Sequence, residues 1–147
     1  PVGGREQGSA AGFEQIEHGA DVGIRVFAPT LPELFRQAAL GMYSLMVDIE
    51  TVRPTDHVDI TLAGDELDLL LVDFLNELLY RTDAQGMLFC DCDVTLASAG
   101  LQARCRGERY DPRRHTIEEG IKAATYHMLA ITEQAAGGYQ ATIIFDV

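Results

Sequence analysis

Basic residues are scarce in this chain of 147 residues, where 11 Lys and Arg stand against 23 Asp and Glu, for a formal net charge of −12. Lys122 is the only lysine, and the other ten basic residues are arginines. A surface this acidic repels phosphate backbones, so we expect no direct high-affinity binding of nucleic acid. The charge instead favours association with a basic partner or with cations.

Long apolar runs are also missing. The longest, within LDLLLVDFLNELLY, is interrupted by Asp73, Asn76 and Glu77, and a membrane-spanning helix needs about 20 apolar residues. No charged segment followed by an apolar one opens the sequence as a secretion signal would. We therefore expect a soluble, cytoplasmic protein with no membrane partner.

Cysteine is limited to three residues, Cys90, Cys92 and Cys105. Cys90 and Cys92 are too close for a Cys-x-x-Cys pair, and no other Cys/His pair has the spacing of zinc ligands. Because free cysteine is usually a small buried residue, we interpret all three as inward-facing positions on strands.

The apolar residues, by contrast, make up nearly half of the chain and recur with regular periods. Residues 1–12 have no such period and are expected to be a disordered tail before a single domain at 13–147. The capping box Thr30-Leu31-Pro32-Glu33 marks the start of one helix. The pattern predicts strands at 13–18, 22–26, 58–62, 87–98, 101–106, 121–132 and 139–147, and helices at about 31–45 and 65–80. This is an α+β fold with two helices packed on a largely antiparallel sheet of about seven strands.

A long polar stretch, 107–120, has no period and is predicted to be a loop. Long loops in compact domains tend to be functional. Its charged residues could contact a partner or form an ordinary solvated surface; they are Asp111, Arg113, Arg114 and His115.

Two carboxylates stand at predicted strand ends. Asp21 follows His18 and a Gly-Ala step where a strand begins, and Asp146 precedes Val147 at the last strand. If these strand ends meet, the two carboxylates and the main-chain or terminal oxygen of Val147 would form a set of hard donors suited to Ca²⁺, Mg²⁺ or Mn²⁺. The alternatives are that Asp21 caps a turn and that Asp146 frays at the surface.

Lys122 lies on the predicted strand 121–132 and could neutralise these carboxylates, because like charges in close proximity are costly. The alternative is a surface lysine in a weak salt bridge. His127 would lie on the other face of that strand, which favours a core histidine.

Several segments together resemble the archease family, in order and at the family's spacing, over residues 13–147. They are HGADVGIRV, LPELFRQAALGMYSLMVD, LLLVDFLNELLYR, GERYDPRRH, IKAATYH and the closing IIFDV. The resemblance implies a small α+β protein with a strand-helix-strand-strand module that catalyses no reaction itself. It would act in tRNA splicing and RNA repair as a protein cofactor of an RtcB-type RNA ligase, which uses GTP and a divalent metal. The cofactor would promote guanylylation of the ligase and its multiple turnover.

The resemblance also assigns roles to residues. It implies metal ligands at Asp21, Asp146 and Val147, and functional roles for Lys122 in the Lys-Ala-x-Thr-Tyr-His motif and for His18 in the His-Thr-Ala-Asp-Val signature. Gly19 here replaces the threonine of that signature, which adds backbone freedom beside the proposed site.

Two other functions stay open. A metal-dependent hydrolase could use the same carboxylates, although the sequence shows no positioned general base and no Gly-rich phosphate loop. A chaperone-like modulator of RNA-modifying enzymes, such as tRNA methyltransferases, would also suit a small acidic module.

Overall fold

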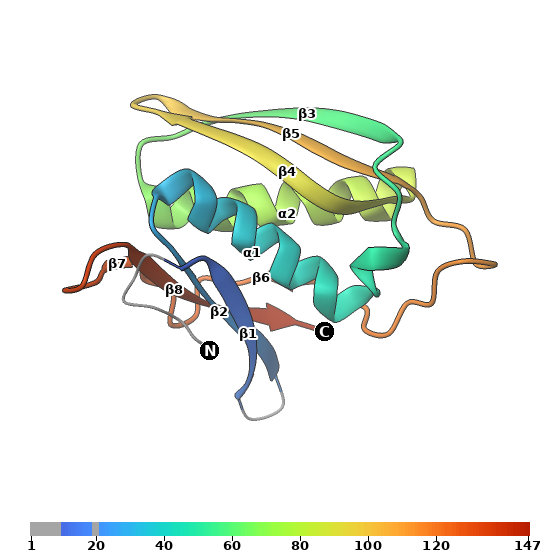
Figure 1. Cartoon of the computed structure of the whole chain (residues 1–147), viewed down its shortest axis with the longest axis horizontal. Helices are drawn as coiled ribbons and strands as arrows, with labels where there is room; N and C mark the ends of the chain where they lie inside the picture. Colours follow the sequence, from blue (N-terminus) through green and yellow to red (C-terminus); the bar gives the residue numbers. More distant parts are fainter. Residues whose placement is uncertain (1–9, 19–20) are drawn as a thin grey trace.

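The structure, a computed structural model, describes residues 10–18 and 21–147 (Figure 1). The first nine residues of the predicted tail and the Gly19-Ala20 step lie outside the described residues. In the described part the helices are α1 (Leu31–Met46) and α2 (Leu67–Gln85), and a short 3-10 turn covers Ile49–Thr51. The strands there are β1 (Gly12–His18), β2 (Asp21–Ala28), β3 (Asp56–Ala63), β4 (Met87–Ala97), β5 (Gly100–Arg109), β6 (Ala123–Ala124), β7 (Thr132–Glu133) and β8 (Tyr139–Asp146).

The two helices lie between two antiparallel sheets (Figure 1). One sheet has the order β1-β2-β8-β6, with β7 also paired to β8, and the other has the order β3-β5-β4. The predicted α+β class is confirmed, and the strands divide between two sheets on opposite sides of the helices. Neither helix in the described part is long and apolar enough to cross a membrane.

Both helices have ends that the sequence specifies. The Thr30 hydroxyl accepts a hydrogen bond from the Glu33 N–H at 3.3 Å, as the capping box predicts, whereas the Glu33 carboxylate accepts bonds from Arg36 and Gln37. α2 ends at Gly86, whose φ of 71° is the left-handed conformation that glycine adopts at helix C-termini.

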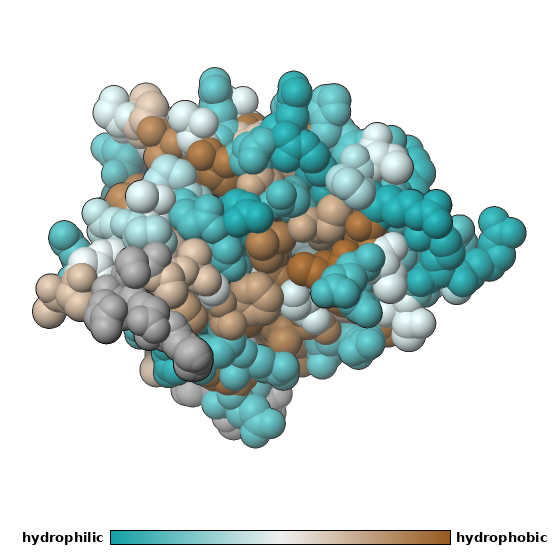
Figure 2. Space-filling model, viewed as in Figure 1, coloured by the Kyte–Doolittle hydropathy of each residue, from teal (hydrophilic) through white to brown (hydrophobic). Residues whose placement is uncertain are grey.

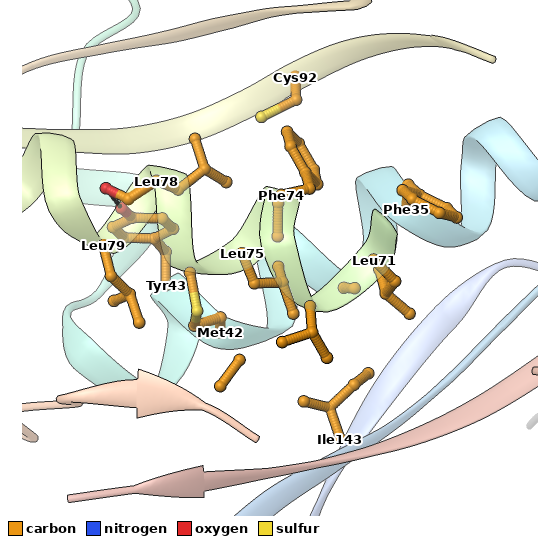
Figure 3. Close-up of a cluster of buried hydrophobic side chains, with 14 of the residues drawn as sticks. Phe35, Met42, Tyr43, Leu71, Phe74, Leu75, Leu78, Leu79, Cys92 and Ile143 are labelled. Carbon is orange, nitrogen blue, oxygen red and sulfur yellow. Dashed lines mark hydrogen bonds between the residues drawn. The ribbon is translucent and has the colours of Figure 1, made fainter. Parts of the chain in front are cut away.

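The core fills the space between the helices and the two sheets (Figure 3). Tyr43 of α1 is fully buried, and its hydroxyl donates to the Leu78 carbonyl at 3.0 Å and lies 2.6 Å from the Thr82 hydroxyl. Burial raises the pKa of Tyr43, so the phenol stays neutral. Its ring meets Phe89 of β4 edge to face, 5.7 Å between centroids, which ties α1 to the three-stranded sheet.

The inward positions predicted for the cysteines hold for two of the three. Cys92 and Cys105 face each other across β4 and β5 and are buried. Cys90 lies where the register of the two strands shifts between Phe89 and Asp91, and it is half-buried as a result.

The predicted strand 121–132 is wrong over most of its length. Strand pairing covers Ala123–Ala124 and Thr132–Glu133, and the residues between them are not strand. The physical reason is that this stretch lies beside α2, whose side chains bond its main chain where a neighbouring strand would otherwise do so. The predicted core position of His127 is also wrong, because His127 is exposed and lies in the non-strand part.

Candidate functional site

Asp21 and Asp146 mark the ends of two neighbouring strands. β2 and β8 pair antiparallel, and the last pair in register is Val22 with Phe145. Continuing that register by one residue places Asp21 opposite Asp146, at the Cα separation of about 4.5–5.5 Å typical of antiparallel pairs. Because Phe145 is buried against the helices, alternation puts both aspartates on the opposite face of the sheet.

β6 brings Lys122 to the other side of Asp146. Ala123 pairs with Asp146, and the Lys122 N–H donates to the Asp146 carbonyl at 2.8 Å. The Lys122 side chain is exposed. Within residues 10–18 and 21–147 it forms no ion pair with a carboxylate.

The possible metal ligands of Asp21, Asp146 and Val147 are all oxygen atoms. Asp21 is half-buried, whereas Asp146 and Val147 are exposed. In the described part of the chain no three His, Cys, Asp or Glu side chains cluster as a metal site. A cation bound by Asp21 and Asp146 would therefore complete its shell with main-chain oxygen, such as that of Val147, and with water. Such a shell suits hard cations.

Close packing fixes the spacing of the strands beside the two aspartates. A Cβ at Gly23 would lie 2.8 Å from the Ile143 carbonyl oxygen, 2.9 Å from Ile144 Cδ1 and 3.2 Å from Ile16 Cγ1. Gly23 shares its face with Asp21, so Ile16 and Ile144 close over it in the next row of the sheet. The carboxylate pair thus borders an apolar row that leaves little room for movement.

His18 is the cross-strand partner of Asp21 in the β1–β2 pair. Its main chain therefore belongs to the same row of the sheet as Asp21. The main chains of His18 and Asp21 therefore lie side by side where β1 ends and β2 begins.

A second charged cluster attaches the long loop to the body of the protein. It is centred on Glu108, which lies near the end of β5, so the predicted loop at 107–120 is wrong at 107–109, which are strand. This carboxylate accepts bonds from the Arg53 N–H at 2.8 Å and from Arg114, and lies 2.9 Å from His115 Nε2. The Arg114 guanidinium, followed by the Arg53 N–H and His115, lowers the pKa of Glu108 to about 2. Glu108 is therefore a carboxylate throughout the physiological range.

His115 is buried, with an exposure of 2%. Its Nδ1 accepts from the Asp111 N–H at 2.9 Å, which leaves Nε2 as the protonated nitrogen that donates to Glu108. The Tyr110 ring stacks on it at 6.1 Å. The interpretation of His115 as a solvated or partner-contacting residue is thus corrected: it anchors the loop to the body of the protein.

Other members of the predicted loop set remain at the surface. Arg113 has 89% of its side chain exposed and lies 3.5 Å from the Asp111 carboxylate. Figure 2 shows that hydrophilic residues dominate the end of the molecule where this segment projects. Arg114 is held more firmly, by Glu108 and by the Thr51 carbonyl.

Sequence reasoning missed two bonded polar residues: Asn76, whose amide bonds the Ala124 main chain, and Glu108, which binds the long loop. The signal for Asn76 was present, because this amide interrupts the apolar sequence of α2 without adding charge. Nothing in the sequence separates Glu108 from the other acidic residues of the polar stretch.

The architecture and the paired strand ends define a class of small α+β protein, in which two helices separate two antiparallel sheets and two aspartates meet at a sheet end. The chain belongs to the Archease protein family, which matches residues 13–147. It is 34% identical over 139 residues to the archease of Pyrococcus furiosus, covering 92% of this chain and 98% of the relative. It is 37% identical to that of Methanopyrus kandleri, covering 92% and 99%.

A solved structure shows the same fold. The solution structure of Methanobacterium thermoautotrophicum protein 1598 matches with a TM-score of 0.77 at 27% identity. The match covers 92% of this chain and 99% of that one.

Proposed function

We propose that this protein activates an RtcB-type RNA ligase in tRNA splicing and RNA repair, without catalysing a reaction itself. It would promote guanylylation of the ligase and restore the ligase to multiple turnover. Membership of the archease family supports this proposal. So does the net charge of −12, which suits docking on a basic partner and disfavours competition for RNA.

The observation that carries the proposal is the meeting of three strand ends around Asp146. Asp21 lies opposite it by register, and Lys122 donates its N–H to the Asp146 carbonyl. Asp21, Asp146 and oxygen from Val147 would hold a divalent cation, Ca²⁺, Mg²⁺ or Mn²⁺, which supplies positive charge at this surface when bound. Lys122 would add a compact ammonium on the Asp146 side of this ion, and His18 of β1 is the cross-strand neighbour of Asp21 on the opposite side.

The proposal is tested with a purified RtcB-type ligase, GTP and a divalent metal. We expect this protein to increase both the rate of ligase guanylylation and the number of ligations per ligase molecule. A ligase whose guanylylation and turnover are unchanged by a stoichiometric amount of the folded protein would refute the proposal.

The same preparation distinguishes the alternatives. Steady release of phosphate from nucleotides by the purified protein alone would indicate a hydrolase. Stimulation of several tRNA methyltransferases, with no effect on the ligase, would indicate a broader modulator.

A further inference from the structure

The segment that contains Lys122 is secured on one side by a single side chain of α2. The amide of Asn76 donates to the Ala124 carbonyl at 3.1 Å and accepts from the Ala124 N–H at 2.8 Å. One side chain thus bonds both main-chain groups of the same residue, as a neighbouring β-strand would. These bonds place β6 beside α2, and no further strand extends this edge of the sheet in the described part of the chain.

The opposite edge of the same segment bonds to β8. The Lys122 N–H donates to Asp146, and the Thr125 N–H and hydroxyl donate to the Ile144 carbonyl at 3.0 Å and 2.8 Å. Ala124 is buried, with an exposure of 4%, so its polar main-chain groups need partners within the protein. Without the Asn76 amide, both groups would be unsatisfied unless the segment moved toward water.

Other polar residues of α2 bond the chain farther on. Asp68 accepts from the Ile131 N–H at 3.1 Å, and Asp73 accepts from the Tyr126 hydroxyl at 3.2 Å. Neither bond lies between α2 and residues 122–124. Asn76 is therefore the α2 residue whose bonds lie closest in sequence to Lys122.

We propose that Asn76 is a positioning residue for the candidate site: its amide completes the outer edge of β6 and so holds Lys122 against Asp146. This inference rests on the proposed function for its consequence in the ligase reaction. Its structural part, the control of the Lys122 main chain, can be measured without any ligase.

The single lysine makes that measurement specific to one residue. Protein labelled with [¹⁵N]lysine and carrying no lysine in a tag gives one backbone amide signal, that of Lys122. In Asn76→Ala, we expect the Lys122 amide to exchange with solvent at least about 10-fold faster than in the wild type, after correction for the change in global stability.

Tyr43→Phe is the matched control. It removes bonds to the Leu78 carbonyl and the Thr82 hydroxyl of α2 but leaves β6 untouched. We expect its Lys122 amide to exchange faster only as far as its lower global stability requires. If Asn76→Ala behaves in the same way as this control, the positioning role is refuted.

The ligase assay supplies the second readout, at a temperature where all variants are folded. Asn76→Ala should reduce stimulation of guanylylation toward the level of Lys122→Ala, whereas Tyr43→Phe should keep it. Full stimulation by Asn76→Ala would overturn the inference. If the wild-type protein gives no stimulation, the proposed function fails, while the exchange experiment still decides whether Asn76 holds Lys122.

Discussion

Glu108→Gln tests how the long loop is attached to the body of the protein. The wild-type carboxylate bonds Arg114, His115 and the Arg53 N–H. Gln keeps the shape but loses the charge, and its NH₂ group would face donors. Hydrogen bonds to a charged group contribute about 1.5–3 kcal/mol each, and loss of one member of a buried ion pair costs about 3–5 kcal/mol.

The structure sets the expected magnitude below the sum of those contributions. The Glu108 side chain is 11% exposed and that of Arg114 is 29% exposed, so water can replace part of the lost interaction. We expect Glu108→Gln to lower the free energy of unfolding at pH 7 by about 2–4 kcal/mol. For a chain of this size that loss corresponds to a fall in melting temperature of about 5–15 °C.

The effect should depend on pH in a defined direction. The folded-state pKa of Glu108 is about 2, below the ordinary value of 4.5. The carboxylate therefore contributes its stabilisation in full above about pH 5, and loses it as the pH falls from there toward 2. The stability difference between wild type and Glu108→Gln, measured by urea unfolding, should shrink over this range.

Asp93→Asn is the control for Glu108→Gln. It makes the same chemical change in an ion pair with Arg106 at 2.6 Å, where 66% of the Asp93 side chain is exposed. Exposed pairs contribute about 0–1 kcal/mol. If Glu108→Gln is no more destabilising than Asp93→Asn at pH 7, or if its effect grows as the pH falls toward 3, the anchoring role of Glu108 is refuted.

Three further predictions concern the candidate site. Asp21→Asn and Asp146→Asn should each weaken divalent-cation binding at least about 10-fold by calorimetry, since each removes a charged oxygen ligand; wild-type affinity in either variant would count against the metal site. Lys122→Ala should have a free energy of unfolding within about 1 kcal/mol of the wild-type value but should lose stimulation of the ligase. Lys122→Arg should restore little of that stimulation. Gly23→Ala should destabilise the fold by about 1–3 kcal/mol in urea unfolding, because its Cβ would lie 2.8 Å from a carbonyl oxygen; unchanged stability would show that the strands can separate there.

Local signals in the sequence predicted the elements whose structure depends on local chemistry. Thr30 and Glu33 placed the start of α1, and alternation placed β2 and β8 within two residues of their ends. The stretch 121–132 was mispredicted because its apolar residues suggested a continuous strand, whereas it pairs with β8 only at short segments and bonds polar side chains of α2 on its other edge. The hydrophobic periodicity of a segment carries no information about which other element of the fold packs beside that segment.

The candidate site could be predicted in its residues but not in its geometry. Carboxylates at two strand ends can be read from the sequence, yet the adjacency of β2 and β8 depends on the strand order of the whole sheet. The burial of His115 was equally hidden, because Glu108 and the Asp111 N–H satisfy its two ring nitrogens inside a stretch whose composition indicates solvent exposure.

The central place of β8 in the five-stranded sheet has a consequence for folding order. β2 ends at Ala28 and β8 begins at Tyr139, so β2 can acquire this partner only after everything from α1 to β7 has been synthesised. β3, β4 and β5, in contrast, come from one continuous part of the chain between Asp56 and Arg109 and can pair without it. On the ribosome, the three-stranded sheet and the helices would therefore form first, while β2 of the β1–β2 hairpin still lacks its partner β8. Asp21 and Asp146 would then be brought together only once β8 has been made, so that a chain that still lacks β8 does not present both carboxylates.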